Sequence, residues 1–551
     1  MLSRKELLKS MLLAGASTAL PIRGLAAQGP SAEITVEDLK AMEKIVGIQF
    51  TDEERKSLLR EVRQKLSGYK AIRDTQINYT DEPRTIFTPV GGGSSDRAKV
   101  TASPSVSKLD INRLSDADIA FLSVTELGQL IRTKKLSPVR LTEIYLARLK
   151  TFGDKLLCVV NLTEERARRE ALEAEREIHS GHYRGALHGI PYGVKDLFAA
   201  KGAPTTWGAN VFAERVFDYD AAVVEKLAKA GAILLGKLSN GTFALGDVWF
   251  KGTTKNPFNP KQGSSGSSAG SASATAAGLV GFAIGTETLG SIISPSTRCR
   301  VTGLRPTYGR TSRYGGMALS YTMDKVGPIC RSAEDTALVL AAICGSDVRD
   351  PSAVDRDLVW PPAEKINNMR IGYLVGPRED SVAASRNPAV VALKKMGAHV
   401  APAKFTPPTN GLLEILNVES ASAFDEFSRG DLIRQLNDSP WKETFRAARY
   451  TPAVEYLQAQ RERARMMQRF QQERDEFDVI IADNIGGLLL TITNLTGTPQ
   501  ITIPWGDDGN GNSISKSLIG RNYKEARLCA VAKLLQNTAD YHRRRPDLSR
   551  F

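Results

Sequence analysis

Hydrophobic and polar residues follow two alternating patterns along most of this chain, one typical of helices and one of buried strands. From about Asp116 onward, amphipathic helical patterns are separated by short apolar runs. Ser123 and Glu126 form a capping pattern at the start of one helix, and Ser137-Pro138 begins another. Apolar runs of strand length lie at residues 230–237, 369–376, 478–483 and 499–505. This alternation predicts a layered α/β domain.

Two further helical patterns precede that domain. The first begins at Thr35 and Asp38, and the second at Thr51 and Glu54, each with the spacing of a capping box. In both, the apolar residues share one face. We therefore expect a helical hairpin within residues 31–88.

A segment rich in Gly, Ser and Pro follows the hairpin. It spans residues 89–110 and carries no hydrophobic periodicity, so it predicts a linker.

The first 27 residues have the features of a secretory signal. A charged start that includes Arg4-Lys5 leads into an apolar stretch at residues 11–20, and Gly24 and Ala26 supply small residues before a cut. The pattern is Tat-like, because Lys5 takes the place of the second arginine of a twin-arginine signal. The apolar stretch is shorter than the roughly 20 residues of a membrane span, and no later segment has transmembrane character. We predict export to the periplasm or the medium after cleavage near Ala26 or Ala27.

Composition adds little that is specific. Hydrophobic residues make up 42% and charged residues 25% of the 551 positions, which is ordinary for a globular protein. The net charge of +13 raises the option of a nucleic-acid partner, but no dense Lys/Arg block is interleaved with aromatic residues. We attribute the charge to solvated helix faces and predict no nucleic-acid partner.

Cysteine and histidine positions point away from a metal centre. None of the five cysteines stands at CxxC spacing, and the five histidines show no HExxH pattern. We predict no metal and no cofactor.

The most informative stretch is the Gly/Ser-rich tract from Gly266 to Ser296. A flexible linker is a poor interpretation, because the Ala-rich part is too apolar to stay solvated and predicts a buried helix followed by a strand. A second interpretation is a nucleophile elbow, since residues 266–270 match G-x-S-x-G with Ser268 at the centre. That elbow needs a core strand directly before it, which the preceding residues do not predict.

The third interpretation is a resemblance to the amidase signature family of amide hydrolases. The family pattern runs G-G-S-S-G-G-S, an Ala-rich stretch, and G-T-D-T-G-G-S-I-R-x-P. Residues 266–271 are similar to its first part and residues 285–295 to its second. "HGIPYGVKDLF" places Lys195 where the family has its catalytic lysine, and "CRVTGLRPTYGR", "TMDKVGPICRS" and "NLTGTPQITIPWG" resemble later blocks. The resemblance covers residues 115–545, in order. It implies an α/β fold with a mixed central β-sheet flanked by α-helices.

The resemblance also implies roles for individual residues. Ser291 would be the nucleophile, and Ser267, with a cis peptide bond, would relay protons between it and Lys195. An unactivated serine is inert, so this chemistry needs a lysine whose pKa is lowered. The oxyanion hole would come from backbone N–H groups of Thr288, Leu289, Gly290 and Ser291. Ser268 and Asp196 would support this network. Without the serines, a structural pair between Lys195 and Asp196 would be the preferred interpretation of that lysine.

The chain departs from the family pattern at four positions near these residues. Leu289 replaces a glycine, Glu287 an aspartate, Ile293 an arginine and Arg300 a glycine. A positive φ at Leu289 would be strained. The ion pair of the missing arginine would be absent, or supplied by Arg298. These changes put the geometry of the loop, and hence the rate, in question.

Several functions remain open at this stage. The leading hypothesis is an exported, stand-alone amidase that acts on a small-molecule or peptide amide. The alternatives are a glutaminase-type subunit of an amidotransferase and a catalytically inactive binding protein of the same fold. Homologues often form dimers, so a homodimer is one expectation for the oligomeric state. Residues 310–470 would supply the walls that determine the substrate, and the sequence does not identify that substrate.

Overall fold

The computed structural model describes residues 33–75, 87–89, 95, 98–107, 109–375, 385–483, 487–509 and 512–551. The predicted signal segment and parts of the predicted hairpin and linker lie outside these residues. The chain divides into two compact units, one ending at Gln64 and one beginning at Lys65. No helix among the described residues is both long enough and apolar enough to cross a membrane.

The first unit contains the two predicted helices, α2 (Val36–Val46) and the beginning of α3 (Asp52–Arg73). Thr35 forms the predicted capping box at the start of α2. Thr51 and Glu54 bond to each other's backbone N–H groups at the start of α3. The Glu43 carboxylate, on α2, binds the Arg55 guanidinium, on α3, at 2.6 Å. A short turn and a buried ion pair thus hold the two helices together.

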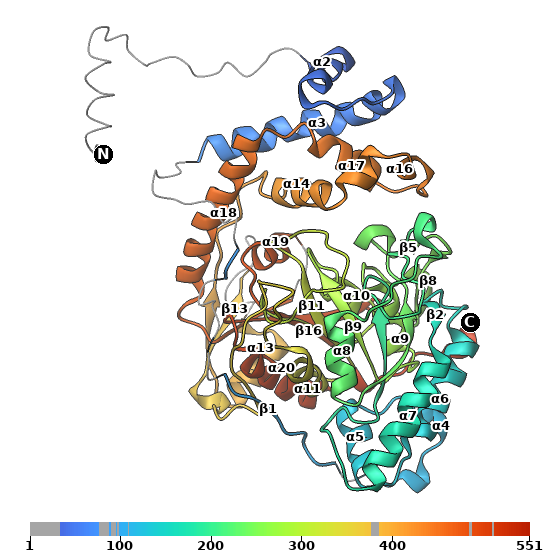
Figure 1. Cartoon of the computed structure of the whole chain (residues 1–551). Coiled ribbons are helices and arrows are strands. Elements are labelled where there is room, and N and C mark those ends of the chain that lie inside the picture. The colour runs from blue at the N-terminus through green and yellow to red at the C-terminus, as the bar shows by residue number, and fades with distance from the viewer. Residues whose placement is uncertain are drawn as a thin grey trace, which may run out of the picture. The chain divides into compact units, whose positions relative to one another are not determined.

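The second unit is built on a mixed sheet of eleven strands, in the order β14-β13-β15-β17-β16-β10-β11-β9-β3-β4-β2 (Figure 1). The mixed sheet flanked by helices confirms the predicted α/β class. In spatial order, the strands are β14 (His399–Ala403), β13 (Arg370–Leu374), β15 (Val479–Ala482), β17 (Ser513–Gly520), β16 (Gln500–Asp507), β10 (Thr302–Arg305), β11 (Lys325–Cys330), β9 (Phe282–Glu287), β3 (Pro191–Lys195), β4 (Ile233–Leu238) and β2 (Val159–Leu162). All four apolar runs predicted as strands lie in this sheet.

Three two-stranded sheets accompany the central one. They pair β1 (Val100–Ala102) with β12 (Leu358–Trp360), β5 (Val248–Trp249) with β6 (Gly252–Thr253), and β7 (Lys255–Asn256) with β8 (Asn259–Gly263). Strand β1 falls inside the segment predicted as a linker, which therefore contains at least one ordered strand.

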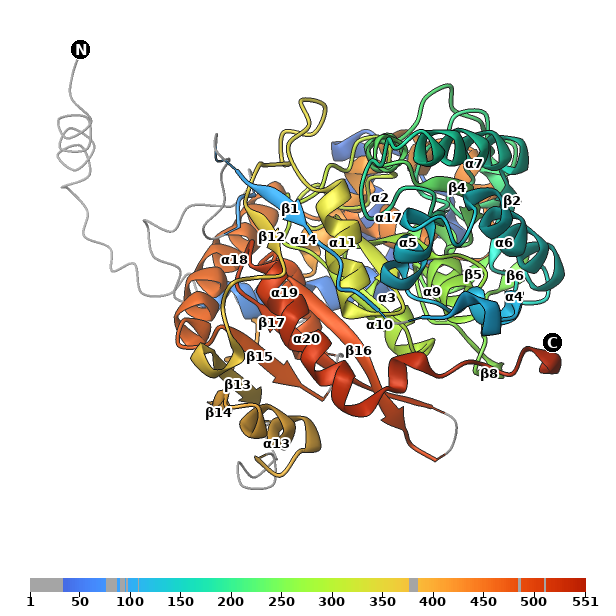
Figure 2. The same ribbon diagram turned by 90° about the horizontal axis from the view of Figure 1, so that it is seen from below.

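Helices cover the sheet on both sides. Helix α11 contacts β10 and β11, α20 contacts β16 and β17, and the two helices contact each other; Figure 2 shows α20 beside β16. Helix α9 contacts β9 and β3, and α10 contacts β10 and β16. The helices of this unit are α4 (Asp116–Ile119), α5 (Val124–Arg132), α6 (Pro138–Phe152), α7 (Glu164–His179), α8 (Ala222–Lys229), α9 (Ala269–Ala276), α10 (Ile293–Arg298), α11 (Ala333–Ile343), α13 (Pro388–Lys395), α14 (Glu414–Ala423), α15 (Asp425–Arg429), α16 (Leu432–Gln435), α17 (Trp441–Ala448), α18 (Ala453–Arg474), α19 (Leu488–Leu495) and α20 (Glu525–Ala539).

Strand direction brings the candidate residues to one edge of the sheet. Strands β3 and β9 are parallel neighbours, with Val194 opposite Ile284. Lys195 is the last residue of β3, and the predicted oxyanion loop follows the last residue of β9. The carboxyl ends of parallel strands share an edge, where α/β proteins typically place their sites.

Candidate active site

Lys195 is the centre of a buried hydrogen-bond network. Its side chain is fully buried at the end of β3. The Nζ atom lies 2.8 Å from Ser267 Oγ and 2.8 Å from Thr286 Oγ1. Ser267 lies 72 positions further along the chain. The structure therefore brings together two of the three predicted reactive side chains.

The surroundings of Lys195 favour its neutral form. Burial holds the pKa of its amine well below the ordinary value, and the nearby Asp324 and Glu287 carboxylates only partly oppose this. A neutral amine can accept a proton from a hydroxyl, whereas an ammonium group cannot. The protonation state needed for a base is thus the one that this site stabilises.

Ser267 and Ser291 belong to adjacent backbone segments. The peptide bond between Gly266 and Ser267 is cis. The backbone N–H of the next residue, Ser268, donates to the Ser291 carbonyl at 3.0 Å. Among the described residues, the Ser291 hydroxyl has no hydrogen-bond partner, and the residue is 7% exposed. Ser291 thus lies beside the Lys195–Ser267 pair with its hydroxyl unengaged.

Gly266 permits the close approach of two loops. A Cβ atom at this position would lie 1.8 Å from the Gly246 carbonyl oxygen. Any side chain here would displace the Ser267 backbone. The glycine preceding the serine is therefore a steric requirement.

The loop after β9 presents backbone donors near Ser291. Within the described part of the chain, the N–H groups of Leu289, Gly290 and Ser291 have no hydrogen-bond acceptor. The positive φ of this loop falls on Gly290, at 91°, and Leu289 is free of that strain. The Thr288 hydroxyl, in the same loop, donates a hydrogen bond to Asp324 Oδ1 at 2.6 Å.

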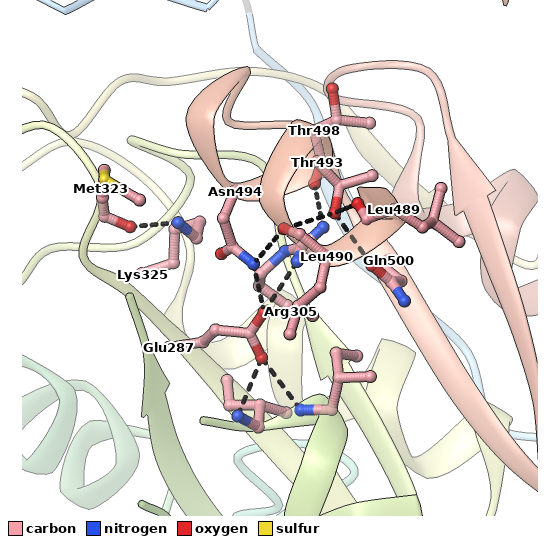
Figure 3. Close-up of polar contacts among 12 residues, drawn as sticks. Glu287, Arg305, Met323, Lys325, Leu489, Leu490, Thr493, Asn494, Thr498 and Gln500 are labelled. Atoms are coloured by element: carbon pink, nitrogen blue, oxygen red, sulfur yellow. Dashed lines mark hydrogen bonds and ion pairs between the residues drawn. The ribbon is translucent and has the colours of Figure 1, made fainter. Parts of the chain in front are cut away.

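Glu287 anchors the backbone that follows Ser291 (Figure 3). Its carboxylate accepts hydrogen bonds from the N–H of Ile292 at 2.8 Å and of Ile293 at 2.9 Å, from Arg305 Nη1 at 2.7 Å and from Asn494 Nδ2 at 2.9 Å. Burial alone would raise the pKa of the Glu287 carboxyl, but Arg305 and these donors outweigh it and lower that pKa. A buried anion thus fixes the start of helix α10.

Arg305 forms the buried ion pair with Glu287. The sequence offers Arg298 as a replacement for the arginine missing at Ile293. Arg298 is instead exposed, and the partner of Glu287 comes from strand β10. At the last of the four departures, Arg300 adopts a φ of 56°, which explains a preference for glycine there.

Asp196 is paired with a different lysine. Its carboxylate accepts hydrogen bonds from Lys237 Nζ at 2.8 Å and from the Thr206 backbone at 2.9 Å. The two predicted supporting residues, Ser268 and Asp196, therefore contact different strands. Ser268 Oγ bonds to the carbonyl and the N–H of Thr286, at 3.1 and 3.2 Å, whereas Asp196 holds the neighbouring strand β4.

Two groups in this site were missed by the sequence analysis. Thr286 bonds to Lys195, and the partly buried Asp324 accepts hydrogen bonds from Thr288 and from the backbone of Leu319. Thr286 could have been suspected from its position at the end of a strand, one residue before the anchoring carboxylate. Asp324 lies in the quoted block "TMDKVGPICRS", but its sequence context alone gives no sign of its partners.

The alternative centred on Ser268 finds less support in the geometry. The strand before it, β8, belongs to a two-stranded sheet and not to the central one. The Ser268 hydroxyl is occupied by the backbone of Thr286.

The five cysteines are free thiols, and the described residues contain no cluster of three or more metal-ligating side chains.

Comparison with known proteins finds a matching family model and similar curated proteins. The Amidase family model matches residues 140–486. A glutamyl-tRNA(Gln) amidotransferase subunit from Acinetobacter baumannii (strain AB0057) is 31% identical over 483 residues, covering 78% of this chain and 98% of that relative.

Solved structures show the same fold. The native peptide amidase from Stenotrophomonas maltophilia is 26% identical, with a TM-score of 0.66, covering 80% of this chain and 99% of that one. An amidase family protein from Bacillus anthracis is also 26% identical, with a TM-score of 0.68, covering 80% of this chain and 95% of that one.

Proposed function

The chain belongs to the amidase family of amide-acting enzymes, and from this premise we propose that it hydrolyses a carboxylic amide to an acid and an amine or ammonia through an acyl-enzyme on Ser291. Ser291 Oγ attacks the carbonyl carbon, and its proton passes through Ser267 to the neutral Lys195 amine. The N–H groups of Thr288, Leu289, Gly290 and Ser291 stabilise the oxyanion.

The proton then returns by the same route to the leaving nitrogen, and the C–N bond breaks. Water attacks the resulting ester and gives up a proton to the relay, which releases the acid and restores Ser291. Every step uses only the substrate, water and groups of this chain, so the mechanism needs no metal or cofactor.

One observation carries this proposal. The Lys195 amine lies 2.8 Å from Ser267 Oγ in a fully buried site that lowers its pKa. A lysine kept for structure alone would be expected to bind a carboxylate, as Lys237 binds Asp196. Lys195 instead hydrogen-bonds to two hydroxyl groups, and one of them adjoins the segment of Ser291.

Covalent labelling with a small fluorophosphonate tests the proposal without knowledge of the substrate. We expect peptide mass spectrometry to find the adduct on Ser291. Lys195→Ala should slow labelling by about 10²- to 10⁴-fold, the range for loss of a general base. Ser291→Ala should remove the adduct. An adduct on Ser268 would support the nucleophile elbow, and no adduct on folded protein would support an inactive binding protein.

A second candidate function is the glutaminase half-reaction of an amidotransferase. It is favoured by the similarity to the amidotransferase relative over nearly its whole length. Glutamine would then be the substrate. Ammonia release from glutamine, measured beside release from a panel of other amides, separates the two candidates, because a stand-alone amidase needs no partner protein to hydrolyse them.

Export and dimerisation are part of the same proposal. The signal pattern of the first 27 residues supports cleavage near Ala26 or Ala27. Sequencing the N-terminus of protein recovered from the periplasm or the medium would test the cleavage. Sedimentation of the mature chain would decide between a monomer and a homodimer.

A further inference from the structure

A side pocket of about 270 Å³ lies next to the candidate active site. Its lining includes Leu197, Phe198, Thr286, Met317, Tyr321 and Val326. The volume exceeds the roughly 150 Å³ of a protein cavity that holds benzene. The pocket is therefore large enough for an aromatic ring with a substituent.

The pocket adjoins the proton relay. Thr286, in its wall, accepts a hydrogen bond from Lys195 through Oγ1 at 2.8 Å, and Lys195 bonds to Ser267. Lys195 is thus separated from the pocket by one side chain. Of the predicted oxyanion loop only Thr288 lines the pocket; Leu289, Gly290 and Ser291 are not in the described lining, and Leu490 of helix α19 approaches Gly290. The pocket therefore lies next to the Lys195–Ser267 relay rather than next to Ser291.

The charged groups that line the pocket are already engaged. Arg313 binds Asp350 at 2.9 Å, and Arg349 binds Glu225 at 2.7 Å. Asp324 accepts hydrogen bonds from Thr288 and two backbone N–H groups, and Lys325 Nζ donates to the Met323 carbonyl. A charged ligand would therefore gain little binding energy from ion pairs with these side chains.

The remaining wall is apolar and firmly supported. Leu197, Ala244, Met317 and Leu319 line the pocket and also belong to a buried cluster with Phe243. A wall backed by packed aromatic rings keeps its shape. An apolar, ring-sized group would therefore fit it best.

We propose that this pocket binds the substituent on the leaving nitrogen, so that the substrates are N-substituted amides that release an apolar amine, such as anilides. The inference rests on the proposed function. When Ser291 Oγ bonds to the carbonyl carbon and the C–N bond breaks, the relay passes the serine proton to the leaving nitrogen. That nitrogen must face the relay, and its substituent then extends toward the pocket beside Lys195.

Two phosphorylating reagents with different leaving groups test this proposal. Diethyl fluorophosphate and diethyl 4-nitrophenyl phosphate transfer the same diethylphosphoryl group to Ser291 and differ only in the leaving group. The ratio of their second-order inactivation rates therefore reports recognition of the leaving group alone. Neither reagent requires that the natural acyl group be known.

Two variants change the pocket at its exposed side. Ala318 lines the pocket and is exposed, so Ala318→Trp should fill its mouth without strain in the core. We expect inactivation by the 4-nitrophenyl reagent to fall at least tenfold and inactivation by the fluoride to change less than twofold. Tyr321, 47% exposed, offers a second variant. Tyr321→Ala should lower the 4-nitrophenyl rate between about twofold and tenfold by removing an aromatic contact. Ala401→Trp, an exposed change on strand β14 outside this lining, is the matched control.

The outcomes separate the two proposals. A selective loss with the 4-nitrophenyl reagent supports the leaving-group pocket. Equal effects on both reagents, or no effect of either variant on a labelled Ser291, would refute the pocket and leave the proposed function intact. Failure of both reagents to label Ser291 in the unmodified protein would overturn the proposed function, and the pocket assignment with it.

Discussion

The Glu287 carboxylate and the Arg305 guanidinium form an ion pair of 2.7 Å in which both side chains are completely buried. Because the same carboxylate accepts the N–H groups of the two residues after Ser291, the pair joins strand β10 to the start of helix α10.

Arg305→Met should lower both stability and the reactivity of Ser291. It leaves the Glu287 carboxylate buried without its partner, which costs about 3–5 kcal/mol in the free energy of unfolding. Denaturant unfolding measures this loss, and fluorophosphonate labelling measures the effect on Ser291. The exposed pair Arg140–Asp116 is the control, since Arg140→Met should cost less than about 1 kcal/mol. Equal costs at the two sites would contradict the anchoring role.

Lys195→Met should make the protein more stable at neutral pH while it abolishes activity. Burial lowers the pKa of Lys195, so the unfolded chain binds a proton there that the folded chain does not. Stability of the unmodified protein should therefore rise with pH between the folded pKa and about 10.4, with a slope of about 1.4 kcal/mol per pH unit from this group.

The variant lacks this contribution. Its advantage in the free energy of unfolding should shrink as the pH rises and vanish above about pH 10. Urea unfolding of both proteins across this pH range measures the difference between their free energies of unfolding. Taking this difference cancels the contributions of the other titrating groups. A constant difference at all pH values would show that Lys195 is protonated in the folded protein.

The rate of Ser291 labelling should depend on the same protonation. Because only the neutral amine accepts a proton, labelling should fall as the pH drops through the lowered pKa of Lys195 and stay level above it. Labelling rates between pH 4 and pH 10 test this. A profile that rises only near about pH 10 would indicate a lysine of ordinary pKa.

Gly290→Ala should disrupt the oxyanion loop. Gly290 has a φ of 91°, and an added Cβ would lie 2.7 Å from Leu490 Cδ2. Movement of the loop should reduce labelling by about 10²-fold or more, as for loss of an oxyanion donor. Gly181 has a φ of 90° with open space around it, so Gly181→Ala keeps the backbone cost without the clash. That control should lose stability and leave labelling unchanged.

Arg300→Gly should be more stable than Arg300→Ala by about 1 kcal/mol. Both variants lose the contacts of the guanidinium with Asp507 and the Phe258 ring. Only glycine adopts the φ of 56° without cost. Thermal unfolding of the two variants makes the comparison, and equal midpoints would mean that the backbone is not strained at this position.

Much of the local structure could be predicted because it depends on neighbours in sequence. Thr35 and Ser123 lie at the starts of helices because each forms a capping box with an acidic residue three positions later. The Ala-rich half of the Gly/Ser tract forms helix α9 and the next apolar run forms β9, as expected from an apolar composition that requires burial. The resemblance to the amidase signature family likewise identified the family, because its motifs are short and ordered along the chain.

The pairing of buried charges was decided by tertiary structure alone. Sequence order alone, without the serines, would have paired Lys195 with the adjacent Asp196, but neighbouring residues of an extended chain point to opposite faces. Asp196 therefore meets Lys237 on the neighbouring strand, and Lys195 meets Ser267 and Thr286. Arg305 and Asn494 reach Glu287 from far along the chain. The sequence by itself indicated the candidate reactive residues and the elements that carry them. Strand order and register decided which charges are paired and which lysine meets hydroxyl groups instead of a carboxylate, because those contacts join segments that no local rule connects.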